Sequence, residues 1–578
     1  MLSTRRLTLL IVGITIMVLA ILLRTLQLQA FGADFAVTSL AQQLETRDLT
    51  APRGNIYDRN GNLLAVSNRT YNVRLDLKNI TDTARVADVL ALSLKRPVAE
   101  VRHDVETILQ NTQSLTGSRS TLLYPNLSPE AIKTLTEMLI SSKVKGLQVE
   151  PSWARAYPQG ALAGPVVGFV SLQPVGYSGV EGYYNQSLNA EPGKISGAGK
   201  LNLTGITMTQ EGADVLLTLD MQLQRFVESE LNKAMTKYGA VEGTIIVMDT
   251  HTGAILASAS APGYDPNQAI DMANDKEAAK RLYDPAVSGL YEPGSVLKLL
   301  TTAAALQAGT TTTITIYEDE GKLDIGGRKI FNSDRAAHGK VDLEKMLELS
   351  LNVVAAKLAI EMGKDKFYNA FRAFGVGSRT GVDLGNEALG VLRTPATSER
   401  WSLSDLATNS YGQGLSMTPL QVLAAINVIA NDGVLIQPYI VQQWRHPNGE
   451  RVTRQPVPVQ RTISPEVARI VRTLMMTATA RGTPDALLKG YSIAGKTGTA
   501  DWYERGIKQE TTKVTYVGMV PAQQPRITIL VKFDQPKNSR WASDNALPVF
   551  HDVAEMAVKI LGIPPDQVGS PKSKVLSP

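Results

Sequence analysis

The sequence predicts an α/β (α+β) protein in which a sheet covered by helices follows one transmembrane helix and a smaller mixed α/β domain. Three observations lead to this prediction: an uncharged run near the N-terminus, a glycine-rich stretch at residues 190–205, and the order strand, helix, strand, strand after about residue 210. That order is typical of a sheet packed against helices. With 578 residues, 43% hydrophobic and 20% charged, the chain can form two or more domains with a sizeable core.

The composition excludes several kinds of chemistry. The chain has no cysteine, so disulfides, thiol catalysis and cysteine-ligated zinc are excluded. Its five histidines show no metal-ligand spacing such as HExxH, and we therefore expect no metal site. The net charge of +5 is too diffuse over this length to favour nucleic acid as a partner. It suits a mixed surface beside an anionic membrane or wall.

The N-terminal run from Leu7 to Leu23 carries no charge over 17 residues and predicts a membrane anchor. As a helix it would extend about 25 Å, at the short end for a bilayer, and Arg24 can snorkel to lengthen it. Arg5 and Arg6 precede the run, which predicts a cytoplasmic N-terminus by the positive-inside rule. A cleaved signal peptide is the alternative, but no small-x-small cleavage site follows and LRTLQLQAF continues the helical pattern. We therefore expect a single-pass protein of the cell membrane, with most of the chain outside the cytoplasm.

The region after the anchor shows mixed strand and helix patterns. Residues 50–70, TAPRGNIYDRNGNLLAVSNRT, contain two short β-type runs around Asn60-Gly61, which predicts a hairpin. A helix is expected from Pro129 to Ser141, begun by Ser128. The glycine-rich stretch AEPGKISGAGKLNLTG is expected to be a linker or an extended ribbon.

Beyond residue 210 the patterns become more regular. VLLTLDMQLQRFVESELNKAM predicts a strand, a turn and a helix capped by Asp220, and GTIIVMDTHTGAILASAS predicts a β-hairpin. Further on, VDLEKMLELSLNVVAAKLAIEMG is typical of a helix, a loop and a second helix.

These patterns divide the chain into five predicted segments. They are a cytoplasmic N-terminus at 1–6, a transmembrane anchor at 7–29, an N-terminal domain at 30–210, a second domain at 211–565 and a disordered tail at 566–578. The boundary near residue 210 follows the glycine-rich stretch, and the tail is rich in Pro, Ser and Lys.

The stretch YEPGSVLKLL at 291–300 places Ser295 and Lys298 three positions apart where a helix is expected to begin. Residues i and i+3 lie on one helix face, so the lysine can reach the serine hydroxyl. A lysine can take that proton only if its pKa of about 10.4 falls toward neutrality, through burial or a second cation. The same spacing also arises by chance, and this chain has another example, Ser142 to Lys145, in a polar stretch.

A second pattern, GKTGTA at 495–500, follows an apolar approach and precedes a strand-like run. On a strand, Lys496 and Gly498 share one face while Thr497 and Thr499 share the other. Gly498 would leave room for another chain to lie close, as when a peptide adds to the edge of a sheet. The hydroxyls and the ammonium would then hold a carboxylate. The alternative is a surface turn rich in threonine.

These residues resemble the class B penicillin-binding proteins, which are membrane-anchored peptidoglycan D,D-transpeptidases of the division or elongation type. The family's active-site motifs are SxxK, SxN and KTG in chain order. They match Ser295 to Lys298, then SLN at 350–352, then KTG at 496–498. The resemblance implies the penicillin-binding serine transpeptidase fold, with a central sheet covered by helices, an α-helical subdomain and an N-terminal pedestal of the dimerisation type.

The SxN motif needs a choice among three matches. SLN at 187–189 precedes the nucleophile, and SDN at 543–545 follows the KTG. Ser350 to Asn352 has the right order and lies about 55 residues after Ser295, within the helix-loop-helix pattern.

The resemblance extends over residues 50 to 560. RGNIYDRNG at 53–61 and GYSGVEGYYNQSL at 176–188 are similar to two signatures of the pedestal, and YGQGLSMTPLQ at 411–421 is similar to a stretch of the transpeptidase domain. The family would place Arg53, Asp58, Arg59 and Glu181 in one charged network, whereas solvated surface charges are the alternative. The sequence departs from many relatives in SVLK, because they carry a threonine and an aromatic residue between the serine and the lysine.

The resemblance also implies roles for the matched residues. Ser295 would attack a stem peptide ending in D-Ala-D-Ala, Lys298 would accept its proton, and the backbone N–H groups of Ser295 and Thr499 would form the oxyanion hole. The remaining roles are these: Ser350 and Asn352 relay the proton and hold the substrate amide, Lys496 lowers the pKa of Lys298, and Thr497, Gly498 and Thr499 form the carboxylate subsite. β-Lactams would acylate Ser295, no metal or cofactor is required, and a SEDS-type membrane glycosyltransferase is the expected partner.

Three other functions are alternatives to transpeptidation for this set of motifs. A β-lactamase uses similar motifs but needs neither a pedestal nor an anchor, and the chain's two ExxLN matches, Glu228 to Asn232 and Glu348 to Asn352, do not form its separate water-activating loop. A β-lactam-sensing receptor usually needs several membrane spans and a cytoplasmic effector. A non-catalytic scaffold of the division or elongation machinery would not require intact SxxK, SxN and KTG motifs.

Overall fold

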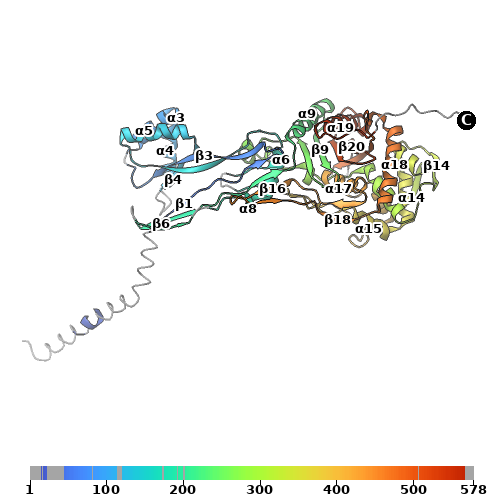
Figure 1. Cartoon of the computed structure of the whole chain (residues 1–578), viewed down its shortest axis with the longest axis horizontal. Helices are drawn as coiled ribbons and strands as arrows, with labels where there is room; N and C mark the ends of the chain where they lie inside the picture. The colour runs from blue at the N-terminus through green and yellow to red at the C-terminus, as the bar shows by residue number, and fades with distance from the viewer. Residues whose placement is uncertain are drawn as a thin grey trace, which may run out of the picture. The chain divides into compact units, whose positions relative to one another are not determined.

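The computed structural model describes residues 15, 17–21, 44–80, 82–112, 120–171, 175–191, 193–198, 202–207, 209–504 and 507–566. Its contacts divide the chain into two compact units (Figure 1). The first unit comprises Met1–Pro52, Arg69–Ala154 and Ala190–Gly212, and the second comprises Arg53–Asn68, Arg155–Asn189 and Ala213–Pro578. Parts of the predicted N-terminal domain therefore belong to the unit that contains Ser295, while the predicted boundaries at 30–210 and 211–565 stay predictions.

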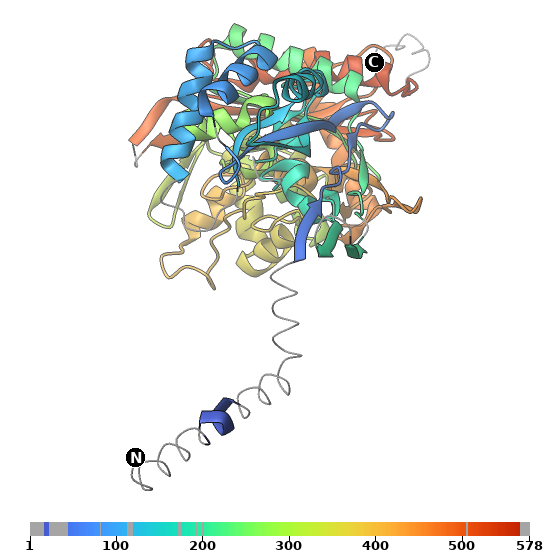
Figure 2. The same cartoon turned by 90° about the vertical axis from the view of Figure 1, so that its left-hand side faces the viewer.

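The first unit packs three helices against strands. These are α3 (Thr83–Leu94), α4 (Val98–Thr112) and α5 (Pro129–Ser142), drawn in blue and cyan in Figure 2, with β4 (Ser120–Leu127) and the second half of β3 (Leu63–Asp76). The prediction for α5 is confirmed, because Ser128 Oγ accepts a hydrogen bond from the backbone N–H of Ala131 at 3.2 Å. The glycine-rich stretch is an extended ribbon: β6 (Gly193–Ala198) and β7 (Asn202–Thr207) pair with β1 (Leu44–Leu49) in the order β1-β6-β7.

The second unit contains the predicted hairpin around Asn60-Gly61. Its strands are β2 (Ile56–Tyr57) and the start of β3, and Gly61 has a φ of 86°, which favours glycine. β2 also pairs in parallel with β8 (Asp214–Leu217). On its other side β8 pairs with β16 (Val441–Arg445), which in turn pairs with β17 (Arg451–Thr453). This ribbon therefore joins segments that are more than a hundred residues apart.

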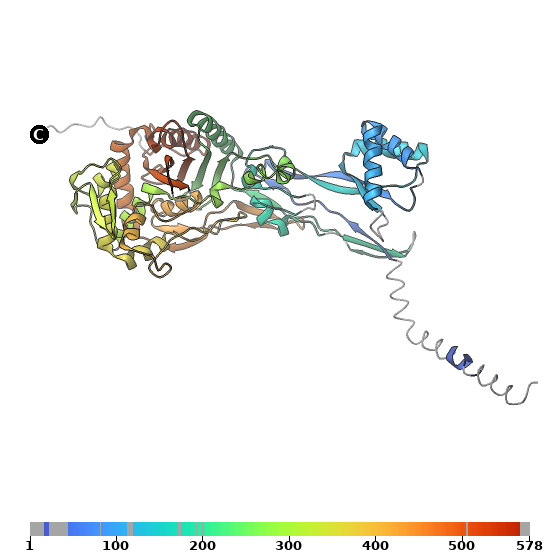
Figure 3. The same ribbon diagram turned by 180° about the vertical axis from the view of Figure 1, so that it is seen from behind.

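The main sheet of the second unit has five strands in the order β10-β9-β21-β20-β19. Its strands are β9 (Glu242–Asp249), β10 (Ile255–Ala261), β19 (Ala494–Glu504), β20 (Ile507–Val520) and β21 (Ile527–Asp534). One face packs against α9 (Met221–Tyr238) and α19 (Ala546–Ile560), and the other packs against α12 (Lys298–Gln307), α17 (Pro419–Ala430) and α18 (Pro465–Gly482) (Figures 1 and 3). The β9–β10 hairpin and the α9 helix capped by Asp220 are confirmed as predicted.

Further helices surround α12 and form a largely helical region. The predicted helix-loop-helix is α13 (Leu343–Leu349) followed by α14 (Asn352–Met362), which confirms that prediction. The other α-helices described in the second unit, not all of them next to α12, are α6 (Gly164–Val167), α7 (Gly179–Tyr183), α8 (Asn185–Leu188), α10 (Ala269–Asn274), α11 (Pro285–Ser288), α15 (Lys364–Ala373) and α16 (Leu403–Asn409). The short strands are β11 (Tyr317–Asp319), β12 (Lys322–Ile325), β13 (Arg328–Phe331), β14 (Gly339–Val341), β15 (Val434–Ile436) and β18 (Pro458–Arg461). The longer strand β5 (Leu147–Ala156) pairs with β3. The 3-10 turns are η1 (Pro266–Gln268), η2 (Ala279–Arg281), η3 (Gly294–Leu297), η4 (Pro484–Ala486) and η5 (Ala542–Asp544).

Most of the predicted N-terminal segments fall outside the described residues. The cytoplasmic segment 1–6 is among them, and of the anchor at 7–29 only residues 15 and 17–21 are described. Among the residues that the structure describes, no helix is both long enough and apolar enough to cross a membrane. Of the predicted tail at 566–578, only Asp566 is described.

Candidate active site

Ser295 lies in the 3-10 turn η3, directly before α12. Gly294 begins the turn with a φ of 65°, and its N–H donates to the carbonyl oxygen of Gly412 at 3.0 Å. A Cβ at Gly294 would lie 2.9 Å from the carbonyl oxygen of Thr499, so a side chain there would collide with strand β19. Lys298 is the first residue of α12, and its Nζ lies 2.9 Å from Ser295 Oγ. The expected approach of the lysine to the serine hydroxyl is therefore present.

Lys298 is fully buried among hydroxyl and carbonyl oxygens. Its Nζ lies 3.1 Å from Ser350 Oγ and also donates to the Ser350 carbonyl oxygen. Burial, followed by the nearby charge of Lys496, holds the pKa of Lys298 well below its usual value. A neutral amine at this position can accept the proton of Ser295.

Ser350 lies between the two lysines. It ends α13 in the left-handed conformation, with a φ of 57°, which a serine adopts only at some energetic cost. This conformation brings its hydroxyl within 3.0 Å of Lys496 Nζ as well as 3.1 Å of Lys298 Nζ. Asn352 begins α14, and its side-chain amide donates to the carbonyl oxygen of Phe331 at 2.9 Å. Of the three SxN matches, the one at 350–352 is therefore the one that meets both lysines.

Lys496 comes from β19, which is an edge strand of the five-stranded sheet because it pairs with β20 alone in the strand order. Its side chain is buried and its Nζ lies 3.3 Å from Thr497 Oγ1. Burial lowers the pKa of Lys496 to about 8. Lys496 and Gly498 are buried while Thr497 and Thr499 are half-buried, which is the predicted alternation of faces.

The segment that packs against Gly498 belongs to the same chain, whereas the sequence pattern indicated an incoming peptide. A Cβ there would lie 2.6 Å from the carbonyl oxygen of Pro293 and 3.0 Å from Val296 Cγ1. The chain for which Gly498 leaves room is thus the protein's own turn at Pro293–Leu297, which we call the nucleophile turn after the role expected of Ser295. Because residue 498 is a glycine, β19 and η3 can approach each other closely. This approach brings Lys496 toward Ser295 and Lys298.

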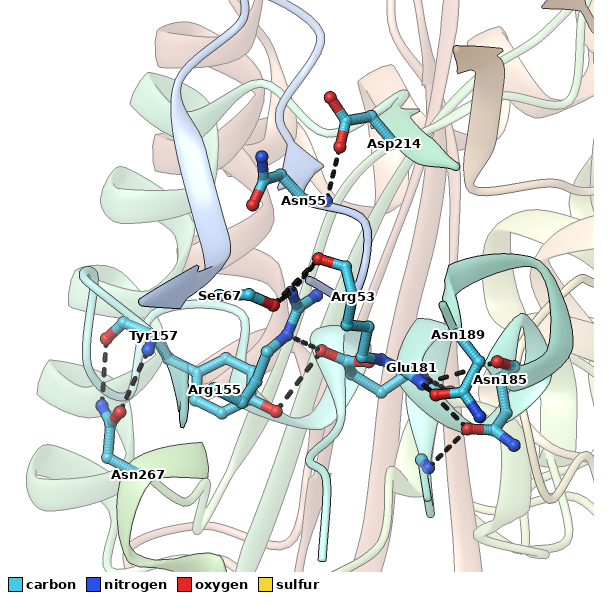
Figure 4. A network of polar contacts seen from close by, with 11 residues as sticks. Arg53, Asn55, Ser67, Arg155, Tyr157, Glu181, Asn185, Asn189, Asp214 and Asn267 are labelled. Carbon is cyan, nitrogen blue, oxygen red and sulfur yellow. Dashed lines mark hydrogen bonds and ion pairs between the residues drawn. The ribbon is translucent and has the colours of Figure 1, made fainter. Parts of the chain in front are cut away.

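The pedestal signatures form a buried charged network, which Figure 4 shows. Glu181 is fully buried and pairs with Arg53 at 2.7 Å and with Arg155 at 2.6 Å. Arg53 also donates to Asn185 Oδ1 at 2.9 Å and to Asn189 Oδ1 at 2.8 Å. The SLN match at 187–189 therefore supplies a structural asparagine.

The expected four-residue charged network needs correction. Asp58 is buried, but its carboxylate accepts from the backbone N–H groups of Asn60 and Asn62 in the hairpin turn, at 2.9 and 2.8 Å. Arg59 is exposed, as expected for a solvated charge. The sequence reasoning missed Arg155, because an isolated arginine carries no motif; its position on a strand beside the signatures was the only available signal.

A cavity of about 240 Å³ lies elsewhere in the second unit. It is lined by residues of α15, α17, β15 and β18 and of the loop at 374–380, among them Arg372, Gln421 and, in the loop, Arg379. It contains none of the predicted site residues. The candidate active site is therefore defined by the contacts of its two buried lysines, and we assign this cavity no catalytic role.

A serine at a helix start, a buried lysine at hydrogen-bond distance and a second buried lysine define a serine acyltransferase type of site that uses no histidine. Comparison with known proteins agrees. The family model "Penicillin binding protein transpeptidase domain" matches residues 243–555, and "Penicillin-binding Protein dimerisation domain" matches residues 48–198. The chain belongs to the penicillin-binding proteins with a transpeptidase domain.

Individual relatives span most of the chain. Penicillin-binding protein PbpB of Mycolicibacterium smegmatis is 30% identical over 91% of this chain and 85% of its own length. The probable peptidoglycan D,D-transpeptidase PenA of Neisseria meningitidis is 29% identical over 98% of this chain and 94% of its own. Penicillin binding protein 3 from Mycobacterium tuberculosis, solved with aztreonam, has a TM-score of 0.68 and 26% identity, covering 91% of this chain and 99% of that one.

Proposed function

We propose that the protein is a serine-type D-Ala-D-Ala transpeptidase that cross-links peptidoglycan stem peptides. The observation that carries the proposal is the 2.9 Å separation between Ser295 Oγ and Nζ of the fully buried Lys298. Relatives across nearly the whole chain are named peptidoglycan D,D-transpeptidases, including FtsI of Escherichia coli, 27% identical over 96% of this chain. This agreement supports the same activity here.

In the first step, Ser295 Oγ attacks the carbonyl carbon of the penultimate D-Ala, and neutral Lys298 accepts the hydroxyl proton. The backbone N–H groups of Ser295 and Thr499 stabilise the oxyanion. Ser295 lies in the first turn of η3, where backbone N–H groups have no acceptor within the helix. The peptide C–N bond then breaks, the proton passes to the leaving nitrogen, and D-Ala departs.

In the second step, an amine from a neighbouring stem attacks the ester carbonyl of the acyl-enzyme. The ester C–O bond breaks, a new amide forms, and the amine's proton returns to Ser295 through the same lysine. Ser350 relays protons, because its hydroxyl lies within 3.1 Å of both Nζ atoms. Asn352 holds the substrate amide, while Lys496, Thr497 and Thr499 bind the terminal carboxylate beside Gly498.

The two lysines divide the work by charge. Lys496, with a pKa of about 8, stays mostly protonated at neutral pH and supplies the cation of the carboxylate subsite. Lys298 experiences both burial and that neighbouring charge, so it is the one that loses its proton first. Two like groups in different surroundings thus become a base and an electrostatic anchor.

We further propose a single-pass location in the cell membrane, with the N-terminus in the cytoplasm and the catalytic unit outside. The support is the uncharged run Leu7 to Leu23 preceded by Arg5 and Arg6. Membership of the family makes a SEDS-type glycosyltransferase the expected membrane partner. Removal of residues 1–30 should release a soluble protein that still binds penicillin, and a protein that stays in the membrane fraction would contradict this topology.

The catalytic proposal is tested by labelling with fluorescent penicillin and mapping the labelled peptide. We expect the label on Ser295, with none in Ser295→Ala and an unchanged yield in Ser142→Ala, which removes the other SxxK serine. Label on Ser142, or none on any residue, would refute the proposal. Cross-linking of a stem-peptide donor to an amine acceptor separates an enzyme from a sensor or scaffold, because both of these can lack acyl transfer to an amine.

A further inference from the structure

A row of paired residues crosses the whole five-stranded sheet next to the nucleophile. The pairing runs Gly498 to Thr515, Thr515 to Lys532, Lys532 to Thr244, and Thr244 to Ser260. Directly paired residues of neighbouring strands point to the same face, so the four side chains beyond the glycine form one polar line. Thr515, Lys532 and Thr244 are buried. Buried polar groups cost free energy unless they have partners, and three of these four side chains have them, whereas Thr244 Oγ1 has no hydrogen-bond partner among the residues that the structure describes.

Lys532 is the centre of this line. Its side chain is 2% exposed, and its Nζ lies 2.5 Å from Asp534 Oδ1 and 3.2 Å from Glu242 Oε1. Burial alone would lower its pKa, but the two carboxylates outweigh burial and keep the pKa of Lys532 above its usual value. The lysine therefore remains charged. Asp534 also pairs with Lys513 at 2.9 Å.

The segment that leads to Ser295 is attached at three points, two on this line and one on Glu242, which pairs with Lys532. The Tyr283 hydroxyl donates to Glu242, and Asp284 Oδ1 accepts from Ser260 Oγ at 2.9 Å. Tyr291 makes the third attachment: Lys532 Nζ lies 5.1 Å from the centre of its ring, and its hydroxyl accepts from Thr515 Oγ1 at 3.2 Å.

Tyr291 connects the line to both halves of the active site. It is four residues before Ser295, and its buried ring leaves the segment little freedom. Thr515, its hydrogen-bond partner, is paired with Gly498, which contacts the nucleophile turn directly. The cation of Lys532 lies against the face of the ring, an attraction that strengthens in a dry interior.

We propose that Lys532 is a positioning residue, which through Tyr291 and Thr515 holds the nucleophile turn in register with strand β19. This inference rests on the proposed role of Ser295 as the acylated residue. Acyl transfer needs the nucleophile, Lys298 and Lys496 in one geometry, and a displacement of about 1 Å can cost on the order of 10²-fold in rate. Lys532 itself touches no reacting atom.

The test compares Lys532→Met with a matched control, Lys513→Met. Both variants remove a lysine that pairs with Asp534, but only Lys532 contacts Tyr291. We measure the acylation of full-length protein by penicillin over a range of concentrations, which separates the saturating rate constant from apparent affinity, together with the thermal midpoint. Lys532→Met should lower the saturating rate constant at least tenfold, Lys532→Arg should restore most of it, and Lys513→Met should stay within about twofold of the wild type.

Two further variants keep the proposal testable if Lys532→Met does not fold. Tyr291→Phe and Thr515→Val each remove one side of the 3.2 Å hydrogen bond with little change in volume. Each should slow acylation severalfold, and the double variant should be no slower than the worse single variant, because one contact is lost in all three. Wild-type rates in both single variants, or equal losses for Lys513→Met and Lys532→Met, would overturn the inference. Failure of the wild type to label at Ser295 would instead overturn the proposed function.

Discussion

Replacement of Lys298 by methionine should nearly abolish acylation while leaving the protein folded. Methionine retains the length and apolar character of the buried stem, so it removes the amine without opening the cavity that alanine would leave. Loss of a positioned general base typically costs about 10²- to 10⁴-fold in rate, or roughly 3–5 kcal/mol of barrier. Lys298 is fully buried, so water has little access to replace it, and we expect a loss toward the upper end of that range.

Stability should change in the opposite direction. The folded-state pKa of Lys298 lies well below its unfolded value, so at neutral pH folding must give up a proton or bury a charge. Methionine removes that cost, and the thermal midpoint should stay level or rise. Acylation is followed by the fluorescence of labelled protein under saturating penicillin, with Lys145→Met of the other SxxK match as the control. A wild-type acylation rate in Lys298→Met would refute the role as base, and a collapse of the thermal midpoint would refute the reasoning on its environment.

Four further outcomes are expected. Lys496→Met should abolish productive binding of a carboxylate-bearing donor yet stabilise the fold by about 1–3 kcal/mol at pH 7 in chemical denaturation. That gain should shrink as pH rises from about 8 toward 10.5, because there the unfolded wild type holds the proton that the folded one has lost; a constant gain would contradict the depressed pKa. Gly498→Ala should slow acylation more than tenfold, since the new Cβ would lie 2.6 Å from a carbonyl of the nucleophile turn; an unchanged rate would show that β19 can move away. Glu181→Gln should destabilise the fold by about 3–5 kcal/mol, as expected for two buried arginines left without a carboxylate, while Arg59→Ala should change it by less than about 0.5 kcal/mol. The penicilloyl adduct on Ser295 should persist for many minutes in intact-mass measurements after excess drug is removed, whereas release within seconds would indicate a hydrolase.

The persistence of the adduct depends on what the two ExxLN matches do in the structure. Glu228 lies in α9, where its carboxylate accepts from the backbone N–H of Ala163 at 2.7 Å and from Gln224 at 2.8 Å. Glu348 lies in α13 and pairs with Lys345 at 2.7 Å. Both are parts of helices with partners of their own, so neither forms a separate loop for activating water.

Local signals in the sequence predicted much of the fold. Asp220 and Ser128 predict the starts of α9 and α5, because the first N–H groups of a helix need a hydrogen-bond acceptor. Each of these side chains accepts from a backbone N–H no more than three residues later, so the signal is local. The pattern KTGT also predicted which side chains share a face of β19, because successive side chains on a strand point to opposite faces whatever lies elsewhere in the chain. The active-site motifs could be chosen by order and spacing, and Ser350 does meet both lysines.

Contacts between distant single residues could not be predicted in the same way. Arg155 and Lys532 belong to no motif, and their meaning depends on strand register, which a single sequence does not specify. The sequence pattern predicts that Gly498 leaves room for an incoming peptide, whereas the atom nearest to a Cβ at this position is the Pro293 carbonyl oxygen of the protein's own turn. That neighbour lies some 200 residues earlier in the chain, beyond the reach of any local pattern.

Because the second unit is assembled from segments that are far apart in the sequence, we expect its parts to fold in a particular order. The contact between Arg53 and Glu181 can form only after another 128 residues have been synthesised, and the contact between Asn55 and Asp214 only after another 159. Residues 69–154, in contrast, supply α3, α4, α5 and β4, which can pack together as soon as they are made. Closing such long loops costs conformational entropy, which slows the formation of these contacts. The β2–β3 hairpin should therefore remain accessible to proteases during biogenesis until β8 has been synthesised and has paired with β2.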